Sequence, residues 1–289
     1  MQDLIALDAM RAWSRAEQVR GRRVALVPTM GFLHEGHLRL LDRARELADR
    51  VVLSIFVNPL QFGPGEDFER YPRDLPRDRA LAQGRAVDVL FLPERAAMYP
   101  EDPAVRVAPG AMGDTLEGAA RPGHFAGVLT VVLKLLAIVE PDVAVFGRKD
   151  FQQATLVRRM AADLDLPVTI DVAPTVRELD GLALSSRNAY LTPEERRAAL
   201  ALSRCLRAVE QAWRGGEASA TALARRGLEV LTQPGVIPEY VALVDERLQP
   251  VVRVSAATVA VVAARVGKTR LIDNVVLGDG VAGDVAVRS

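Results

Sequence analysis

Two histidines stand close together at a point where a helix is expected to begin. His34 and His37 are separated by Glu35 and Gly36, and this spacing on a first helical turn places both imidazole rings on one face. The N-terminus of a helix has unpaired N–H groups and a partial positive charge, which suit a phosphate group. Gly36 has no side chain, so a ligand could approach the backbone closely. The pattern indicates two hydrogen-bond donors to phosphate oxygens, which would stabilise the charge on a leaving pyrophosphate.

The residues on either side of this run predict the elements that position the histidines. Residues 24–27, Val-Ala-Leu-Val, are typical of a short buried strand, and the apolar spacing of residues 38–48 predicts a helix. A strand, a turn and a helix start are therefore expected in succession. An isolated His-x-x-His pair is also typical of a surface or metal-binding pair, but its place between a strand and a helix favours the phosphate interpretation.

Two further apolar runs are each followed by polar side chains that could also bind a ligand. Asn58 and Gln61 come after residues 51–57, and their amides both donate and accept hydrogen bonds, which suits a ligand with hydroxyl groups and a carboxylate. Lys149 follows residues 143–146 at an expected helix start, where it could meet a phosphate. By itself the first segment is more typical of an ordinary polar loop, and the second is more typical of a solvated charge run at the end of a helix.

Apolar runs alternate with helical periodicity over the first part of the chain. Each run is almost wholly apolar, as expected for strands of a parallel sheet covered by helices on both faces. In such a sheet ligands bind beyond the carboxyl ends of the strands, where the polar groups above are expected to lie. The sequence therefore predicts an α/β fold with a doubly wound parallel sheet. The expected strands are residues 24–27, 51–57, 87–93, 143–146 and 168–172, and the expected helices are residues 8–20, 38–48, 125–139 and 151–164.

The pattern changes in the last two fifths of the chain. A helix-start signature begins at Thr192, with Thr as N-cap, Pro at the first helical position and Glu at the third. Helices followed by strands predict a smaller α+β domain, so we expect two domains, residues 1–175 and residues 176–289. The chain from Gly278 onward is expected to be mobile. The expected helices here are residues 193–214 and 218–231, and the expected strands are residues 240–244, 258–264 and 271–276.

The composition is that of a soluble globular protein. Of the 289 residues, 49% are apolar and 26% are charged. The formal net charge of zero provides no basic field, so neither nucleic acid nor an anionic membrane is expected as a partner. The single cysteine, Cys205, is expected in the core. The N-terminus lacks a signal pattern, and the apolar stretch of residues 127–139 is too short to span a bilayer, so we expect a cytoplasmic protein.

Taken together, these motifs resemble those of a known family. The run from His34 to His37 resembles the His-x-Gly-His signature of the nucleotidylyltransferase superfamily. The longer run from Pro28 to His37, Pro-Thr-Met-Gly-Phe-Leu-His-Glu-Gly-His, is similar to the pantothenate synthetase (pantoate–β-alanine ligase) family in particular. Later segments match the same family in order, over nearly the whole chain. The resemblance implies a Rossmann-like nucleotidylyltransferase fold and a homodimer.

The resemblance also implies an ATP-dependent ligase. (R)-Pantoate would attack the α-phosphate of Mg²⁺·ATP to give pantoyl adenylate and pyrophosphate, and β-alanine would then attack the adenylate to give pantothenate and AMP. Mg²⁺ would bridge phosphate oxygens and need few protein ligands. One alternative is another His-x-Gly-His nucleotidylyltransferase that moves AMP onto a phosphorylated acceptor. A second is a nucleotide-sensing module without turnover.

Individual residues receive roles from the same resemblance. The catalytic residues would be His37, His34 and Lys149. Pantoate would be bound by Gln61 and Gln153, with β-alanine also at Gln61 and with Asn58 nearby, and residues 62–74 would form a gate over the substrate. ATP would be bound by Met30, Gly31, Phe32, Leu33, His34, Glu35, Gly36, His37, Gly147, Arg148, Lys149, Asp150, Val176, Leu184, Ser185, Ser186 and Arg187.

Two positions depart from the family pattern. Leu184 stands where methionine is usual, which is a volume-conserving change. Arg148 stands where the family has the glutamate of Gly-Glu-Lys-Asp. If the family's glutamate has a direct catalytic role, this protein should be impaired and Arg148→Glu should improve it. If the side chain faces solvent, the same substitution should change turnover little. We favour little change, with the side chain in solvent, because Gly147, Lys149 and Asp150 are intact.

Four other polar residues carry weaker expectations. His124, at an expected helix start, should serve as a cap rather than as a catalyst, and Gln152 should face solvent. Asp78 and Asp88 could contribute to a metal site, although nothing in their spacing indicates one.

Overall fold

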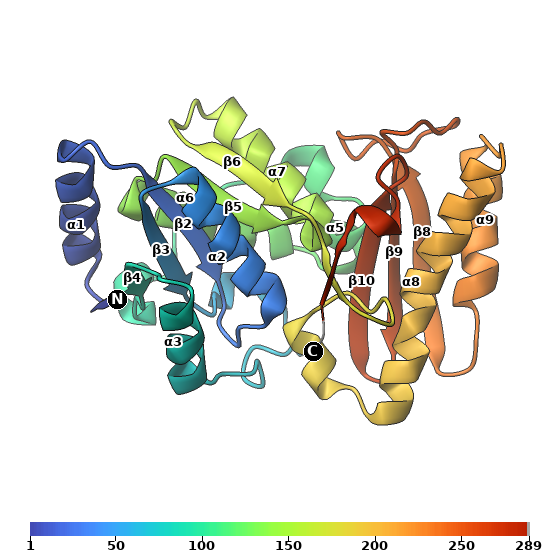
Figure 1. Ribbon diagram of the computed structural model, residues 1–289, viewed down its shortest axis with the longest axis horizontal. Helices are drawn as coiled ribbons and strands as arrows, with labels where there is room; N and C mark the ends of the chain where they lie inside the picture. The colour runs from blue at the N-terminus through green and yellow to red at the C-terminus, as the bar shows by residue number, and fades with distance from the viewer. Residues whose placement is uncertain (288–289) are drawn as a thin grey trace. The chain divides into compact units, whose positions relative to one another are not determined.

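The structure of the protein, a computed structural model, describes residues 1–287 (Figure 1). The described chain divides into two compact units. The N-terminal unit contains residues 1–147 and 152–173, and the C-terminal unit contains residues 148–151 and the chain from residue 174 onward. Each unit encloses hydrophobic core residues of its own, so each is described separately.

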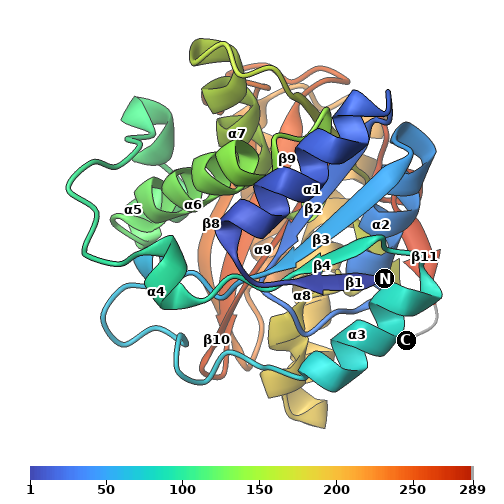
Figure 2. The same cartoon turned by 90° about the vertical axis from the view of Figure 1, so that its left-hand side faces the viewer.

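A six-stranded parallel sheet forms the centre of the N-terminal unit (Figure 2). The strands follow the order β1-β4-β3-β2-β5-β6, and every adjacent pair is parallel. The carboxyl ends of β2 and β3 lie side by side, with Thr29 opposite Ile55. The strands are β1 (Gln2–Leu4), β2 (Val24–Thr29), β3 (Arg50–Ile55), β4 (Val89–Phe91), β5 (Val143–Gly147) and β6 (Thr169–Ala173).

Helices cover both faces of this sheet. Along β2, Val24 and Leu26 lie in a core formed with α1, α6 and α7, whereas Ala25 and Val27 lie in a core formed with α2 and α3. The predicted doubly wound α/β fold is therefore confirmed. Within the described part of the chain, no helix is long and apolar enough to cross a membrane. The helices are α1 (Leu7–Val19), α2 (Glu35–Leu47), α3 (Leu75–Gly84), α4 (Arg95–Met98), α5 (Glu117–Ala120), α6 (His124–Val139) and α7 (Phe151–Asp163).

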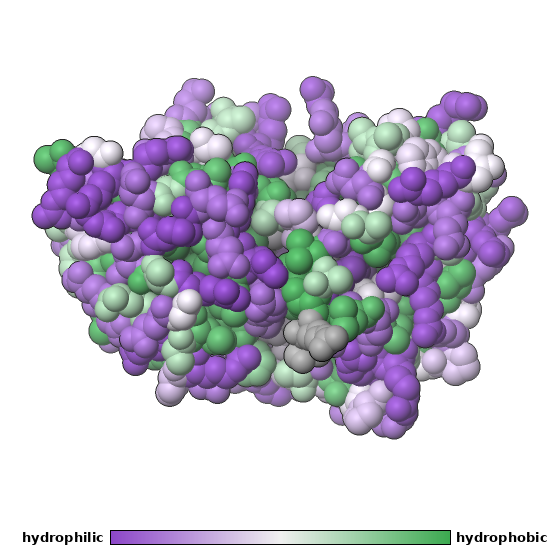
Figure 3. All heavy atoms as spheres, viewed as in Figure 1, coloured by the Kyte–Doolittle hydropathy of each residue, from purple (hydrophilic) through white to green (hydrophobic). Residues whose placement is uncertain are grey.

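Strand β1, helix α3 and the four-residue helices α4 and α5 of the N-terminal unit were not expected from the sequence. Strand β1 has three residues, too few for a period to emerge. Helix α3 buries only Asp78 and Ala82, so it has no apolar stripe that could be recognised. By contrast, α1 combines buried positions such as Met10 with an outer side of charged residues, and hydrophilic atoms cover the region where it lies in Figure 3.

The C-terminal unit packs two helices against an antiparallel sheet. Helices α8 and α9 contribute Leu206 and Leu223 to a core completed by Val262 of the central strand. In the β9–β10 hairpin, Val266 lies opposite Thr269, so the turn is reduced to two residues and Gly267 adopts a φ of +58°. The elements are α8 (Pro193–Arg214), α9 (Ala220–Leu231), β8 (Val236–Val244), β9 (Val259–Val266) and β10 (Thr269–Val276).

The end of the chain forms a further small sheet. Strand β11 (Val285–Val287) pairs in parallel with β7 (Val176–Glu178), after a short 3₁₀ turn at Val281–Gly283. Val281 and Val287 are buried. The segment after Gly278, which was expected to be mobile, is therefore held by strand pairing and burial as far as Val287. The sequence pattern missed the pairing because each strand has only three residues.

Candidate active site

The two motif histidines interlock at the N-terminus of α2. His34 is the N-cap, with an extended backbone (φ −136°), and its Nδ1 accepts a hydrogen bond from the Gly36 nitrogen at 3.1 Å. His37 Nδ1 accepts from the His34 nitrogen at 3.3 Å, which completes a capping box. The ring centroids lie 4.1 Å apart. The rings are adjacent as expected, but the helical spacing is not the cause, because His34 precedes the first turn.

The capping bonds determine which nitrogen of each ring carries the proton. A neutral imidazole that accepts a hydrogen bond at Nδ1 carries its hydrogen on Nε2. The Nε2 atoms of His34 and His37 are therefore donors, held beside a helix N-terminus that favours anions. This arrangement suits phosphate oxygens.

A buried carboxylate on α3 holds the turn that leads into the histidines. Asp78 is 1% exposed and accepts hydrogen bonds from the backbone nitrogens of Phe32 and Leu33, each at 2.7 Å. Gly31 and Phe32 both have positive φ, +83° and +51°, which is unfavourable for phenylalanine. Burial raises the pKa of the Asp78 carboxyl. Sequence reasoning missed this role because no local pattern links α3 to the turn.

Asn58 and Gln61 form one buried hydrogen-bonded group beyond β3. Gln61 Nε2 lies 3.3 Å from Met30 Sδ, so this loop meets the turn beyond β2. Asn58 Nδ2 donates to Gln61 Oε1 at 3.0 Å and to the Gly127 carbonyl at 3.1 Å, while its Oδ1 accepts from the Tyr99 hydroxyl at 3.0 Å. Asn58 is 1% exposed. Asn58 therefore orients the Gln61 amide.

His124 is not a cap, and this expectation from the sequence is wrong. As the first residue of α6 it places Nδ1 2.9 Å from the Gln61 carbonyl and Nε2 3.0 Å from Arg121 Nη1. Because arginine only donates, Nε2 accepts and Nδ1–H donates to Gln61. Burial, and secondarily Arg121, lowers the pKa of His124 to about 4. Arg121 also pairs with Glu66 of the expected gate at 2.6 Å.

The two glutamines at the start of α7 differ in surroundings. Gln152 is 5% exposed, so the expectation that it faces solvent is wrong. Its Oε1 accepts from the Glu117 nitrogen at 3.0 Å, and its Nε2 donates to the carbonyls of Met112 and Thr115 at 3.0 and 2.9 Å. These bonds fix the segment that joins the 3₁₀ turn Gly110–Gly113 to the start of α5. Gln153, on the same turn, is partly exposed.

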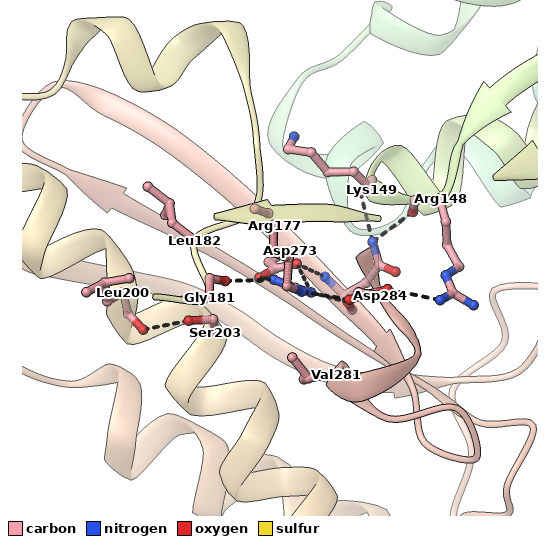
Figure 4. A network of polar contacts seen from close by, with 12 residues as sticks. Arg148, Lys149, Arg177, Gly181, Leu182, Leu200, Ser203, Asp273, Val281 and Asp284 are labelled. Carbon is pink, nitrogen blue, oxygen red and sulfur yellow. Dashed lines mark hydrogen bonds and ion pairs between the residues drawn. The ribbon is translucent and has the colours of Figure 1, made fainter. Parts of the chain in front are cut away.

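A second group of predicted ATP contacts belongs to the C-terminal unit. Arg148, Lys149 and Asp150 form a 3₁₀ turn directly after β5, which ends at Gly147. Asn274 of β10, which is 2% exposed, donates to the carbonyls of Arg148 and Lys149 at 3.0 and 2.8 Å (Figure 4). The side chain of Lys149 points away from this network in Figure 4. The backbone of the turn is therefore fixed while the ammonium group is directed elsewhere.

Arg148 does not face solvent, which corrects the expectation above. Its side chain is 16% exposed and pairs with Asp279 at 2.6 Å and with Asp284 at 3.0 Å. The second oxygen of Asp284 binds Arg177 at 2.6 Å, and Arg177 also pairs with Asp273 at 2.6 Å. Short-range sequence patterns could not reveal these partners, since they lie about a hundred residues or more from Arg148 and Arg177.

The remaining predicted ATP contacts are neighbours on β7 and the turn that follows it. Leu184 donates its backbone N–H to the Val176 carbonyl at 2.9 Å. Ser185 caps the 3₁₀ turn Ser186–Tyr190, and its Oγ accepts from the Arg187 nitrogen at 3.3 Å. Ser186 is buried. The fold of the C-terminal unit thus brings these residues together.

Two further expectations concern residues outside these groups. The Asp88 carboxylate accepts from the Val51 nitrogen at 2.8 Å and from Arg50 at 3.2 Å, so it fixes the start of β3. Cys205 is fully buried in the core as expected, and burial raises the pKa of its thiol to about 12. Among residues 1–287, no group of three or more His, Cys, Asp or Glu side chains could hold a metal ion.

The fold and the site together define a class of protein. A doubly wound parallel sheet carries, beyond its second strand, a helix N-terminus with two histidine donors, and the next strand is followed by a buried amide pair. Polar groups at the carboxyl edge of such a sheet are typical of nucleotide-binding α/β enzymes.

Comparison with known proteins identifies the family. The family model for pantoate–β-alanine ligase matches residues 4–276. Pantothenate synthetase of Heliobacterium modesticaldum is 52% identical over 279 residues, which cover 96% of this chain and 99% of the relative. A crystal structure of pantothenate synthetase from Thermus thermophilus matches with a TM-score of 0.89 at 49% identity, covering 96% of this chain and 99% of that one.

A third relative was crystallised with ligands. Pantoate–β-alanine ligase from Francisella tularensis, complexed with β-γ ATP and β-alanine, matches with a TM-score of 0.81 at 33% identity and covers 97% of this chain and 99% of its own. The chain belongs to the pantoate–β-alanine ligase family. It is an ATP-dependent ligase that joins pantoate to β-alanine.

Proposed function

We propose that His34 and His37 act on the departing pyrophosphate during formation of pantoyl adenylate. The pantoate carboxylate forms a bond to the α-phosphorus of ATP as the bond to the β-phosphate oxygen breaks. Charge then grows on the pyrophosphate, and hydrogen bonds that strengthen with it lower the barrier. The capping box carries this proposal, because it leaves the proton of each neutral ring on Nε2 beside the helix N-terminus.

Lys149 provides the third catalytic group in this proposal. Its ammonium group would bind the triphosphate as a point charge. The side-chain amide of Asn274 donates two hydrogen bonds to backbone carbonyls of the turn. These bonds support this role, since they fix the main chain from which the Lys149 side chain extends. ATP would be contacted further by residues 30–37, by Gly147 to Asp150, and by Val176 with Leu184 to Arg187.

Gln61 and Gln153 would bind pantoate, and Gln61 would also contact β-alanine. The Gln61 amide is oriented by Asn58 at 3.0 Å, and the Gln61 backbone by His124 at 2.9 Å. Such preorganisation favours in-line attack. In the second half-reaction the amine of β-alanine forms a bond to the acyl carbon of the adenylate, and AMP leaves. Residues 62–74 would gate this site.

Mg²⁺ would accompany ATP. When bound, it neutralises charge on phosphate oxygens and needs few protein ligands. Residues 1–287 contain no cluster of three or more acidic, His or Cys side chains suited to a metal. These residues are compatible with a Mg²⁺ ion that would be held mainly by the triphosphate. Lys149 and the two histidines would bind the remaining phosphate oxygens.

The oligomeric state, the location and the domain roles are part of the same proposal. We infer a homodimer in the cytoplasm, with residues 1–175 as the ATP- and pantoate-binding domain and residues 176–289 as the smaller domain. The partners would be pantoate and β-alanine, without nucleic acid or membrane, as the net charge of zero suggests.

The decisive experiment is ATP–pyrophosphate exchange with each substrate omitted in turn. Pantoate alone should support exchange, because the adenylate forms before the amine enters. Exchange that strictly requires β-alanine would contradict the two-step route. AMP formation without pantoate would contradict the ligase assignment itself.

A further inference from the structure

The C-terminal segment Gly278–Val287 lies beyond the residues that the family model matches, which end at 276. It nevertheless folds back onto the C-terminal unit. Val285 is opposite Val176 in the β7–β11 pair, and its backbone nitrogen donates to the Thr175 carbonyl at 2.9 Å. The segment is therefore attached to the strand that begins with a proposed ATP contact.

Two acidic residues of this segment hold Arg148. The carboxylate of Asp279, whose side chain is half-exposed, lies 2.6 Å from Arg148 Nη1. The carboxylate of Asp284, whose side chain is 3% exposed, lies 3.0 Å from Arg148 Nη2. Asp284 is also bound by Arg177, which is equally buried (Figure 4). Each oxygen of the Asp284 carboxylate is bound by a different guanidinium group, so the two ion pairs together fix its position.

The residue held in this way is the neighbour of Lys149. Arg148 and Lys149 share the turn whose carbonyls accept from Asn274. The turn is thus fixed on its backbone by β10 and through the Arg148 side chain by the C-terminal segment. A glutamate at position 148 would instead face two carboxylates of like charge.

We propose that segment Gly278–Val287 is a brace for the ATP-binding turn, and that Arg148 is the positioning residue through which the brace acts. The proposal rests on the assignment of Lys149 to ATP given above. The brace does not touch substrate, and Arg148, whose guanidinium group is paired with Asp279 and Asp284, would meet ATP only through its backbone. It restricts the turn from which Lys149 extends, so its loss should weaken ATP binding and leave β-alanine binding unchanged.

The test compares Arg148→Gln, Asp284→Asn and the double variant in the full-length enzyme. Each single variant should raise the KM for ATP roughly tenfold and leave the KM for β-alanine within about twofold. The effects of the two substitutions should be less than additive in the double variant, since both remove the same Arg148–Asp284 contact. Hydrogen exchange of the Val285 amide should accelerate in each variant.

Two additional variants guard against trivial explanations. Asp279→Asn removes a partner of Arg148 without touching Arg177, so it should give a smaller change of the same kind even if Asp284→Asn folds poorly. Arg197→Gln removes an exposed ion pair with Glu194 on α8 and should leave both KM values and the Val285 amide unchanged.

Three outcomes would overturn the brace. The first is a Val285 amide that still exchanges slowly in the Arg148→Gln variant. The second is an additive rise of the KM for ATP in the double variant. The third is an unchanged KM for ATP in variants whose Val285 amide exchanges faster. Lys149→Ala separates the last case from a failure of the proposed site. If Lys149→Ala impairs adenylation, the site stands and only the brace is wrong, whereas normal adenylation would mean that the ATP assignment of the turn has failed.

Discussion

Asp78 Oδ1 lies 2.7 Å from the backbone nitrogen of Leu33, and the other oxygen of the same carboxylate is equally close to Phe32. The two bonds span 46 and 45 residues of sequence and stabilise a phenylalanine with positive φ two residues before His34. The geometry of the phosphate turn therefore depends on a residue outside the motif.

Asp78→Asn should impair the turn. The amide presents only one acceptor to two backbone N–H groups, so one buried donor is left unpaired, and the free energy of unfolding should fall by about 1–3 kcal/mol. Adenylation should slow by about tenfold or more, because the histidines lose their fixed position. Amide exchange at Phe32 and Leu33 should accelerate.

Arg79→Gln is the matched control for that experiment. Arg79 lies on the same helix and forms an exposed ion pair with Asp3. Exposed ion pairs contribute little to stability, so stability and adenylation should change little. Equal effects of the two substitutions would mean that Asp78 matters only through the stability of α3.

His37→Ala should slow adenylation by about 10²-fold, the scale of one lost preorganised donor. His37→Gln should recover part of that loss if hydrogen bonding rather than proton transfer dominates. The half-reaction that starts from preformed pantoyl adenylate should be much less affected, since no pyrophosphate leaves in it. A stable and fully active His37→Ala enzyme would refute the assignment of this turn as catalytic.

Lys149→Ala should lower the rate of adenylation by roughly 10²-fold, since an ammonium group that offsets developing charge is lost. Pre-steady-state measurement of adenylate formation would report this directly. A surface control is Lys268→Ala in the exposed β9–β10 turn, which should behave like the wild-type enzyme.

His124 predicts a dependence of stability on pH. The unfolded chain takes up this proton near pH 6.5 and the folded chain only near pH 4, because burial and Arg121 disfavour the charged ring. The unfolded state therefore binds more protons in this range, and stability should fall as pH decreases from about 6.5 to about 4. His124→Asn keeps a donor for the Gln61 carbonyl but does not titrate.

Denaturant unfolding at several pH values would measure the effect. The His124→Asn variant should lose less stability than the wild type across that window, and the two curves should run parallel at higher pH. Curves that are parallel throughout would contradict the low pKa. The charged groups that face the ring, Arg121, Glu66 and Glu117, are present in both proteins.

Much of this molecule could be read from local sequence alone. The apolar runs that became β2, β3 and β5, and the helix start at Thr192, are properties of residues close in sequence, since they follow from side-chain periodicity and local capping. The His-Glu-Gly-His run likewise predicted a helix N-terminus that suits a phosphate group, because the unpaired N–H groups belong to the first turn of the helix and depend only on residues close in sequence.

Tertiary structure decided what holds those groups in place. The partners of Phe32, Gln61 and Arg148 are Asp78, His124 and Asp284, each contributed by a distant element. The sequence led us to expect Arg148 in solvent and His124 as a cap, because a polar side chain has no period that reveals its partner. Local propensity determines which elements form, whereas burial requires each polar group to find a partner, and only the complete fold determines which one.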